Sequence, residues 1–407
     1  MLRFLTAGES HGQGLVAILE GMPSGLAIDE EAMAVDLHRR QGGYGRGRRM
    51  AIESDRAQIL SGVRMGRTTG APIALVIANK DWTNWQRTMH VGAEPAPDAT
   101  GASRTPVTRP RPGHADLAGV LKYGHDDIRD VLERASARET AARVAAASVA
   151  RQLLGRFGIE VLSHVYAIGA VAVPEPLAVA AGRVRAIPVD SPLHCADPEV
   201  EQEMIRAIDA AREAGDTLGG AFEVIVTGLP PGLGSYTQWD RKLDGRLEQA
   251  LMSIPAIKGV GIGKGPLVAA LPGSRIHDEI LPVTGSGASG HPATPVSRPT
   301  NNAGGLEGGV TNGEELRVSG FMKPIATLMK PLRSVDLSTM TASPAAIERS
   351  DVCAVTAAAV VGEAMVALVV ADAFLEKFGG DSLAEVERNY AATTASLRAR
   401  FAAPARS

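Results

Sequence analysis

The segment from Val352 to Val370, VCAVTAAAVVGEAMVALVV, decides the fold, because alanine and valine fill every side of the helix that it predicts. A helix that is apolar all round lies either at the centre of a large core or in a membrane. This segment contains Thr356 and Glu363, owes much of its bulk to alanine and lacks a basic cluster at its start. We therefore expect a buried core helix from about 352 to 378, ended by Gly379-Gly380, and no membrane span.

The composition is typical of a globular protein and argues against several other classes. The 407 residues include 42 basic and 45 acidic side chains, a net charge of −3 that argues against a nucleic-acid coat or a membrane-surface protein. Hydrophobic residues make up 45%, enough for a core, and aromatic residues only 4%. The two cysteines, Cys195 and Cys353, exclude a disulfide scaffold, and we expect both to be reduced and buried. Met1–Gly8 lacks the apolar region of a signal peptide, which predicts a cytoplasmic protein.

Around the core helix, strands and helices mix without strict βαβ order, which indicates an α+β fold. A helix from Asp29 to Arg40 has Asp29 as its N-cap, and a helix over 134–157 starts with a capping box of Ser136 and Glu139. Further strands are expected at 1–8, 14–20, 72–78, 159–173 and 222–226, and further helices at 198–214 and 239–253. We expect one domain over 1–390, long polar loops at 79–112 and 282–313, and a disordered tail over 391–407.

Arginines gather in glycine-rich loops, which predicts an anion site, since guanidinium groups bind phosphate and carboxylate through two parallel hydrogen bonds. These arginines are Arg39, Arg40, Arg46, Arg48 and Arg49, followed later by Arg104, Arg109 and Arg111. A solvated basic face is the alternative reading. RNA binding is a weaker one, because Tyr44 is the only aromatic residue nearby.

Two histidines lie beside glycines in such loops. His11 follows Gly8-Glu9-Ser10, and His114 follows Arg111-Pro112-Gly113. Each is a candidate acid that titrates near neutral pH, although a structural histidine bonded to its own loop remains the alternative. The other histidines show no metal-ligand spacing, so we expect no metal site.

Two further segments suit a ligand. The helix start Arg134-Ala135-Ser136-Ala137-Arg138 offers free backbone N–H groups to an anion, or is a plain capping box. The run from Asn302 to Gly313 has two glycine pairs, and Lys323–Thr327 and Arg349-Ser350-Asp351 come after it. Neither a GxGxxG fingerprint nor a P-loop is present, which argues against a Rossmann or P-loop nucleotide site.

Six motifs, in order between residue 1 and about residue 390, resemble those of the chorismate synthase family. They are Gly8–Gly12, Gly43–Gly47, Arg111–Asp116, Arg134–Thr140, Gly304–Gly313 and Arg349–Asp351. The resemblance implies a single-domain β-α-β sandwich that assembles into a homotetramer. It also implies conversion of 5-enolpyruvylshikimate 3-phosphate to chorismate and phosphate, the last common step of the shikimate pathway to aromatic amino acids. In this 1,4-anti elimination the C3 phosphate and a C6 proton leave, and reduced FMN is required without net redox change.

The resemblance assigns expected roles to individual residues. His11 is expected to protonate the departing phosphate, His114 to maintain the flavin's protonation state near N1, and Asp351 to act as the base for the C6 proton. Substrate or anion binding is expected of Arg40, Arg46, Arg49, Arg111 and Arg349, and Arg40 and Arg46 also match nicotinamide positions of bifunctional members. Flavin contacts are expected from Arg134, Ala135, Ser136, Pro255, Ala256, Gly308, Lys323, Pro324, Ile325, Ala326, Thr327 and Arg349.

The chain departs from the family pattern at Pro255-Ala256, where many relatives carry Gln-Ala before Ile257-Lys258-Gly259. Proline is compatible with a flavin contact through its carbonyl, but not with one through a side-chain amide or N–H. The stretch Val283–Pro299 is longer than expected and predicts a surface loop or lid. Since no reductase domain is visible, we expect a monofunctional enzyme that uses NADPH only indirectly, through an external flavin reductase. The alternatives are a bifunctional enzyme that reduces its own flavin and a non-catalytic phosphate- or RNA-binding protein.

Overall fold

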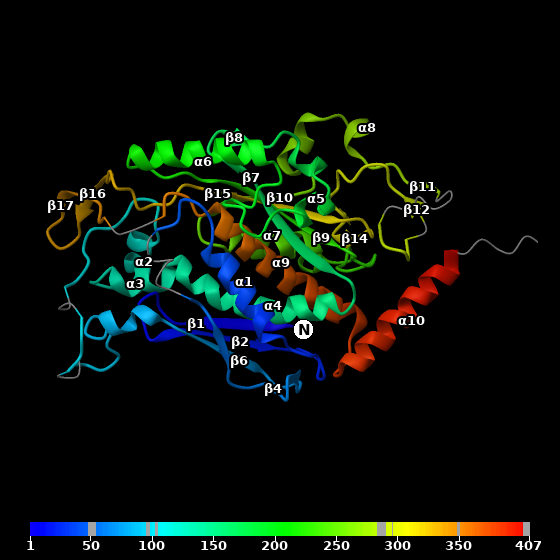
Figure 1. Cartoon of the computed structure of the whole chain (residues 1–407), viewed down its shortest axis with the longest axis horizontal. Helices are drawn as coiled ribbons and strands as arrows, with labels where there is room; N and C mark the ends of the chain where they lie inside the picture. The colour runs from blue at the N-terminus through cyan, green and yellow to red at the C-terminus, as the bar shows by residue number, and fades with distance from the viewer. Residues whose placement is uncertain are drawn as a thin grey trace, which may run out of the picture.

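The protein is described by a computed structural model over residues 1–47, 54–94, 98–101, 105–282, 290–294, 296–347 and 351–401. Two β-sheets lie on opposite sides of a layer of helices (Figure 1). This mixed architecture confirms the predicted α+β class and the β-α-β sandwich.

The N-terminal sheet is antiparallel, with the strand order β1-β2-β6-β3. Its strands are β1 (Arg3–Ala7), β2 (Gly14–Glu20), β6 (Ile73–Ala78) and β3 (Ala57–Ile59). Alternate residues of each strand point to opposite faces, and Leu15, Leu19 and Leu75 on the inner face are buried. On the outer face, Leu5 pairs with Ile18, and both are exposed.

The second sheet is also antiparallel and has the order β10-β15-β9-β7-β8. Its strands are β10 (Ile257–Ile262), β15 (Leu316–Met322), β9 (Gly220–Thr227), β7 (Glu160–Ile168) and β8 (Val171–Ala172). The expected strands at 159–173 and 222–226 correspond to β7, β8 and β9.

Four helices fill the space between the sheets: α1 (Glu30–Gln41), α4 (Thr140–Gly155), α7 (Leu243–Met252) and α9 (Val355–Phe378). Helix α4 packs on β2 and β6, α9 packs on β7 and β9, and the two helices pack on each other. Gly362 lets α9 approach the sheet closely, because a Cβ there would lie 2.5 Å from the ring of Phe222. As expected, Asp29 caps α1 by accepting hydrogen bonds from the backbone N–H groups of Glu31 and Ala32.

Helix α9 is the buried core helix that the Val352–Val370 segment predicts. It is the one described helix that is long and apolar enough to cross a membrane, and 89% of its most apolar window is buried inside the molecule. Cys195 and Cys353 are free and buried, and burial raises the pKa of each thiol to about 11.

The remaining elements lie around this sandwich. The longer helices are α2 (Asp116–Tyr123), α3 (Arg129–Ala135), α6 (Pro198–Glu213) and α10 (Leu383–Phe401). Short helices are η2 (Lys80–Asn84), η3 (Ala137–Glu139), η4 (Pro176–Ala178), α5 (Ala181–Arg185), η5 (Trp239–Arg241), η6 (Gly265–Ala270) and α8 (Gly273–Ile276). Short strand pairs are β4 (Val63–Arg64) with β5 (Arg67–Thr68), β11 (Leu281–Pro282) with β12 (Val296–Ser297), β13 (Leu306–Glu307) with β14 (Val310–Thr311), and β16 (Arg333–Asp336) with β17 (Thr341–Pro344).

The helix predicted over 134–157 is divided. Helix α3 ends at Ala135, Ser136 is extended, and α4 begins only at Thr140 after the short helix η3. Ser136 Oγ accepts a hydrogen bond from Arg138 N, two residues on, and the Glu139 carboxylate pairs with Arg143 at 2.8 Å. The predicted capping box between Ser136 and Glu139 is therefore wrong, because the glutamate is held by an arginine of the next turn.

The C-terminal prediction also needs correction. Residues 391–401, expected to be disordered, continue α10. This segment is rich in alanine and contains Leu397 and Arg398, which are good helix formers. It contains no proline, and the next proline in the chain is Pro404. Residues 402–407 lie outside the described part of the chain.

Candidate active site

The loop between β1 and β2 carries the first predicted catalytic residue, His11. Gly8 begins the loop at φ 103°, and a Cβ there would lie 2.3 Å from Gly14 O, so only glycine allows this close approach. Asn79 fixes the conformation of the loop, because its Nδ2 donates to Glu9 O and Gly12 O at 3.1 and 2.9 Å.

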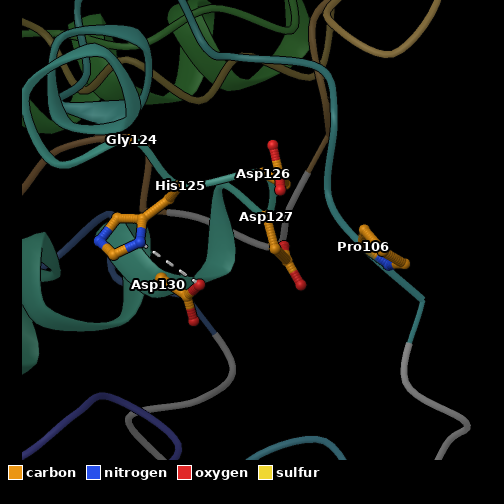
Figure 2. A pocket seen from close by; sticks show the side chains of 6 residues that line it. All are labelled: Pro106, Gly124, His125, Asp126, Asp127 and Asp130. Carbon is orange, nitrogen blue, oxygen red and sulfur yellow. Dashed lines mark ion pairs between the residues drawn. The ribbon is translucent and has the colours of Figure 1, made fainter.

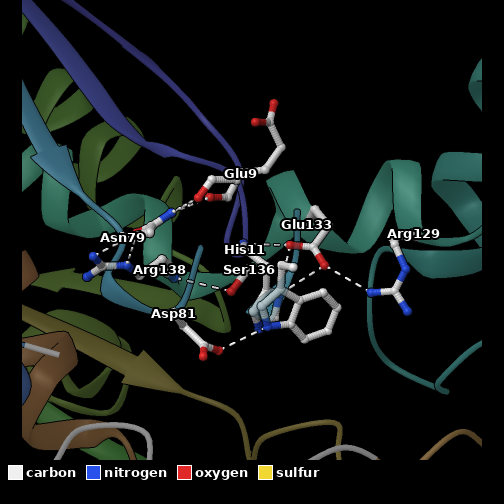
Figure 3. A network of polar contacts seen from close by, with 10 residues as sticks. Glu9, His11, Asn79, Asp81, Arg129, Glu133, Ser136 and Arg138 are labelled. Carbon is white, nitrogen blue, oxygen red and sulfur yellow. Dashed lines mark hydrogen bonds and ion pairs between the residues drawn. The ribbon is translucent and has the colours of Figure 1, made fainter. Parts of the chain in front are cut away.

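The His11 side chain is held on two sides (Figure 3). Its Nδ1 lies 3.0 Å from both carboxylate oxygens of Glu133 in α3, and its backbone N–H donates to Glu133 Oε2 at 2.9 Å. Its ring stacks on the indole of Trp85, with the centroids 3.9 Å apart. Sequence reasoning assigned no role to Glu133 or Trp85, because no local pattern links either residue to His11.

The second predicted histidine, His114, lies just before α2. Its Nδ1 is 2.5 Å from Asp116 Oδ1, and Arg111 Nε donates to Asp116 Oδ2 at 2.8 Å. Burial raises the pKa of Asp116, but hydrogen bonds from His114 and Arg111 lower it more, so the pKa lies well below its usual range. The buried carboxylate therefore fixes both the histidine and the arginine.

The His114 loop contacts the predicted flavin segment 323–327. Lys323 Nζ donates to Gly113 O at 2.7 Å, and Arg111 Nη1 donates to Thr327 Oγ1 at 3.4 Å. Burial, together with the positive charge of Lys258, lowers the pKa of Lys323. Neither lysine has a carboxylate partner in the described part of the chain, which makes this segment suitable for an anion.

Pro255 and Ala256 form the turn between α7 and β10, closed by a hydrogen bond from Ile257 N to Ile254 O at 3.1 Å. Pro255 occupies the position where proline favours such a turn, and Ala256 has φ 68° at the next position. The Ala256 carbonyl accepts from Lys323 N at 2.9 Å, which joins these two predicted flavin segments.

A buried arginine cluster lies next to the His11 loop. Arg138 Nη1 binds both oxygens of Asp55 at 2.7 and 2.6 Å, and its Nε and Nη2 donate to Asn79 Oδ1. Arg40 Nη2 donates to Arg138 O at 3.5 Å, and Arg40 Nε has no hydrogen-bond partner among the described residues. Burial lowers the pKa of Arg40 to about 10, with Asp55 raising it and Arg138 and Arg46 lowering it.

Arg46 and Asp351 extend this cluster. Arg46 Nε lies 3.3 Å from Asp351 Oδ2, and Gly47 N donates to Asp351 Oδ1 at 2.6 Å. A backbone hydrogen bond of 2.8 Å from Val352 N to Gly45 O holds the two segments together. Arg46 and Asp351, which come from opposite ends of the sequence, therefore lie together near Arg40, and both affect the pKa of Arg40.

Other predicted residues lie differently. Arg39 belongs to the core, because it pairs with the buried Glu363 at 2.6 Å. Arg134 donates to Thr6 O at 3.0 Å and to Gly8 O at 3.3 Å, and Ala135 and Ser136 follow it at the junction of α3 and η3. Arg48, Arg49, Arg104 and Arg349 lie outside the described residues, as do 283–289 and 295 of the predicted loop over 283–299.

Gly308 is away from these clusters. It forms the turn between β13 and β14, beside Tyr236. Figure 1 shows β14 on the other side of the molecule from α2 and α3, which flank the two histidine loops. A single chain therefore leaves Gly308 distant from the predicted flavin residues in α3, Arg134 and Ala135.

An open pocket between α2 and α3 is chemically different from the arginine cluster (Figure 2). It is lined by Pro106, Gly124, His125, Asp126, Asp127 and Asp130. Asp127 Oδ1 has a structural role here, because it accepts from the backbone N–H groups of Val107 and Arg129 at 2.9 Å. The carboxylates make this pocket unsuitable for an anion, whereas Arg40, Arg46 and Arg138 suit one.

Comparison with known proteins agrees with this chemistry. The family profile described as chorismate synthase matches residues 2–375. Curated relatives named chorismate synthase include one from Geobacter metallireducens, 56% identical over 390 residues, covering 96% of this chain and 98% of the relative. Another, from Moorella thermoacetica, is 59% identical over 392 residues, with the same two coverages of 96% and 98%.

The fold has a solved counterpart as well. A crystal structure titled as chorismate synthase aligns with a TM-score of 0.75 and 42% sequence identity, covering 98% of each chain. Since profile, relatives and fold agree over nearly the whole length, the chain belongs to the chorismate synthase family.

Proposed function

We propose that His11, His114 and Asp351 handle the protons of the reaction that this family catalyses. That reaction is the 1,4-anti elimination of phosphate from 5-enolpyruvylshikimate 3-phosphate, which gives chorismate in the shikimate pathway. His11 protonates the departing C3 phosphate, and Asp351 is the base for the C6 proton. His114, held by Asp116, maintains the protonation state of the flavin.

The observation that carries this proposal is the buried arginine cluster between the His11 loop and Asp351. In the described part of the chain, Arg40, Arg46 and Arg138 lie together next to the carboxylates of Asp55 and Asp351, and the Nε of buried Arg40 has no hydrogen-bond partner there. Burying an excess of positive charge is costly unless an anion compensates it. A substrate with one phosphate and two carboxylates supplies that compensation, and preorganised charges of this kind are commonly the largest catalytic contribution. Arg111 and Arg49 complete the proposed anion-binding set.

Reduced FMN is the proposed cofactor. The residues that would hold it are Arg134–Ser136, Pro255-Ala256, Lys323–Thr327 and Arg349. Lys323 supports this assignment, since its ammonium group lies beside the main chain of the His114 loop and near the charge of Lys258, and neither lysine has a carboxylate partner among the described residues. Bound there, reduced FMN would supply electron density to the reacting ring without net redox change.

We infer that the reductant comes from outside the chain. In the sequence no dinucleotide fingerprint accompanies Arg40 and Arg46, the two positions that bifunctional members use for a nicotinamide cofactor. NADPH then acts only through an external flavin reductase, and NADPH with oxidised FMN in air gives no chorismate. Cytoplasmic location and a single domain over 1–390 remain predictions.

A homotetramer is the proposed assembly. The outer face of the N-terminal sheet supports it, because Leu5 is 73% and Ile18 is 42% exposed at directly paired positions of β1 and β2. Exposed apolar patches on a sheet are typical of protein–protein contacts. If Gly308 contacts flavin as the family pattern implies, it does so in the site of a neighbouring subunit.

The test of this function is an anaerobic assay. Purified protein with photoreduced FMN and 5-enolpyruvylshikimate 3-phosphate should release phosphate and form chorismate in equal amounts. Oxidised FMN under the same conditions is the control and should give neither product. A folded protein that binds both ligands and yields no product with reduced flavin would refute the proposal.

A further inference from the structure

The hydrogen bonds of His11 converge on one buried carboxylate. The Glu133 side chain is 1% exposed, and its oxygens face both the Nδ1 atom and the backbone N–H of His11. Ser10 N also donates to the Glu133 backbone oxygen at 3.0 Å, so both the loop and the ring are tied to α3. No function assigned above to the reacting groups uses Glu133.

Glu133 is ionised in this environment. Burial raises its pKa, but the hydrogen bonds and charge of His11, together with Arg129, lower it more, and the net pKa is below its usual value. Arg129 Nη1 lies 3.1 Å from Glu133 Oε1, one turn earlier in α3. A buried, ionised carboxylate is only a hydrogen-bond acceptor, so the facing Nδ1 of His11 must carry a proton.

The proton on Nδ1 determines what the other ring nitrogen can do. In the neutral ring Nε2 is then the acceptor, and in the imidazolium Nε2–H is the proton available for transfer. Within the described residues Nε2 has no hydrogen-bond partner, and the His11 side chain is 17% exposed. The second nitrogen is thus left for a ligand.

Trp85 restricts rotation of the ring. Its indole stacks on the imidazole at an interplanar angle of 25°, and its Nε1–H donates to Asp81 Oδ2 at 3.0 Å. The Arg129 guanidinium lies 5.2 Å from the same indole. In the described part of the chain, the charged groups that contact His11 or its stacked indole are therefore Glu133 and Arg129 from α3 and Asp81 from η2, and Glu133 is the one that contacts the imidazole.

We propose that Glu133 is the positioning residue of His11: its carboxylate keeps the proton on Nδ1, stabilises the imidazolium and directs Nε2 to the leaving phosphate. Glu133 touches neither substrate nor cofactor and acts only through His11. The catalytic part of this inference rests on the proposed function of His11. The inference that Nδ1 carries the proton in the neutral ring does not depend on that function.

The test compares Glu133→Gln with the wild type and with Asp130→Asn, a control on the exposed side of the same helix. Glutamine keeps the shape but has one acceptor oxygen instead of two and no charge. Partners that orient a metal-bound histidine typically contribute about 10- to 100-fold, and we expect kcat to fall by a similar factor. KM should change less than about twofold, because binding of the substrate rests on the arginines.

Two readouts separate positioning from a merely structural role. The basic limb of the kcat–pH profile should move to lower pH in Glu133→Gln, since the imidazolium loses its counter-charge. Glu133→Asp, which restores the charge, should recover part of this shift. Unchanged kcat and an unchanged profile in Glu133→Gln would overturn the proposal.

The tautomer is measured directly by ¹⁵N NMR of histidine-labelled protein, with the His11 signals identified by their loss in His11→Gln. Wild type should show Nδ1–H as the neutral tautomer, and Glu133→Gln should show a mixture. A wild-type Nε2–H tautomer would refute the positioning role even if Glu133→Gln does not fold. If the tautomer is as expected but His11→Ala retains full activity, the catalytic role of His11 fails while the Glu133 contact stands.

Discussion

Asp116 Oδ1 lies 2.5 Å from His114 Nδ1, and Arg111 Nη2 donates to the same oxygen at 3.0 Å. One carboxylate, 1% exposed in its side chain, therefore orients a proposed flavin-facing histidine and a proposed anion-binding arginine together. His11 and Glu133 form a second pair of the same kind, so each proposed catalytic imidazole has its own buried carboxylate.

Asp116→Asn should lower kcat by about 10- to 100-fold, because the neutral amide neither fixes the proton on His114 Nδ1 nor balances Arg111. Steady-state kinetics with reduced FMN measure the effect. Asp126→Asn, in the neighbouring open pocket, is the matched control and should be like wild type. Wild-type kcat in Asp116→Asn would rule out the orienting role.

Arg46→Ala should raise KM for 5-enolpyruvylshikimate 3-phosphate by about 10- to 100-fold, the range for a hydrogen bond to a charged group. Arg206→Ala, at an exposed position of α6, provides the control. Titration of substrate at saturating reduced FMN separates KM from kcat. An unchanged KM would show that Arg46 does not bind the substrate.

Glu363→Gln should destabilise the fold by about 3–5 kcal/mol, the typical cost of breaking a buried ion pair. Its carboxylate is fully buried in α9 and binds Arg39, Arg151 and Ser163. Denaturant unfolding at pH 7 measures the loss. Exposed Glu203→Gln is the control, and a change below about 1 kcal/mol in Glu363→Gln would contradict the prediction.

The same carboxylate predicts an acid dependence. Burial raises the pKa of Glu363, but Arg39 and Arg151 lower it more, so its folded-state pKa lies below the ordinary 4.5. Its contribution to stability is therefore present above about pH 4.5 and is lost as the pH falls toward the folded-state pKa. Unfolding free energies between pH 7 and 3 should fall less steeply in Glu363→Gln than in wild type, and parallel curves would refute the assignment.

Ala256→Gly should stabilise the fold by up to about 1 kcal/mol, since alanine at φ 68° carries a strain that glycine lacks. Thermal unfolding measures the change, with Ala250→Gly in α7 as the opposite control, expected to destabilise. A loss of stability in Ala256→Gly would contradict the prediction that the strain at Ala256 outweighs the added entropy of glycine in the unfolded chain.

Leu5→Lys should weaken the proposed assembly, because a charge would be buried where the outer face of the N-terminal sheet meets another subunit. Light scattering after size exclusion should give a tetramer for wild type and a smaller species for Leu5→Lys. Val189→Lys, at another exposed apolar residue, is the control. An unchanged tetramer in Leu5→Lys would exclude this face as an interface.

Local patterns predicted most elements of the sandwich. The alternation in β9, the Asp29 cap of α1 and the apolar run of α9 each arise from neighbours in the chain, where backbone sterics and burial act at short range. The division of the predicted 134–157 helix was missed because Arg138 at the junction binds Asp55 and Asn79, which are far away in the chain and come close only on folding. The C-terminal part of α10 was missed because residues 391–407 were predicted to be a disordered tail, although many residues of 391–401 are good helix formers.

The sequence by itself determined which residues carry chemistry: arginines, histidines and glycines occur in loops with an ordered set of motifs, and side-chain type alone limits what they can bind. Tertiary structure decided which carboxylate holds which histidine and which arginines share an anion site. Those contacts join residues such as His11 and Glu133, or Arg46 and Asp351, that are far apart in the chain. Charge and hydrogen bonding between such residues depend on distances of a few ångströms, and only the packing of the two sheets on their helices sets these distances.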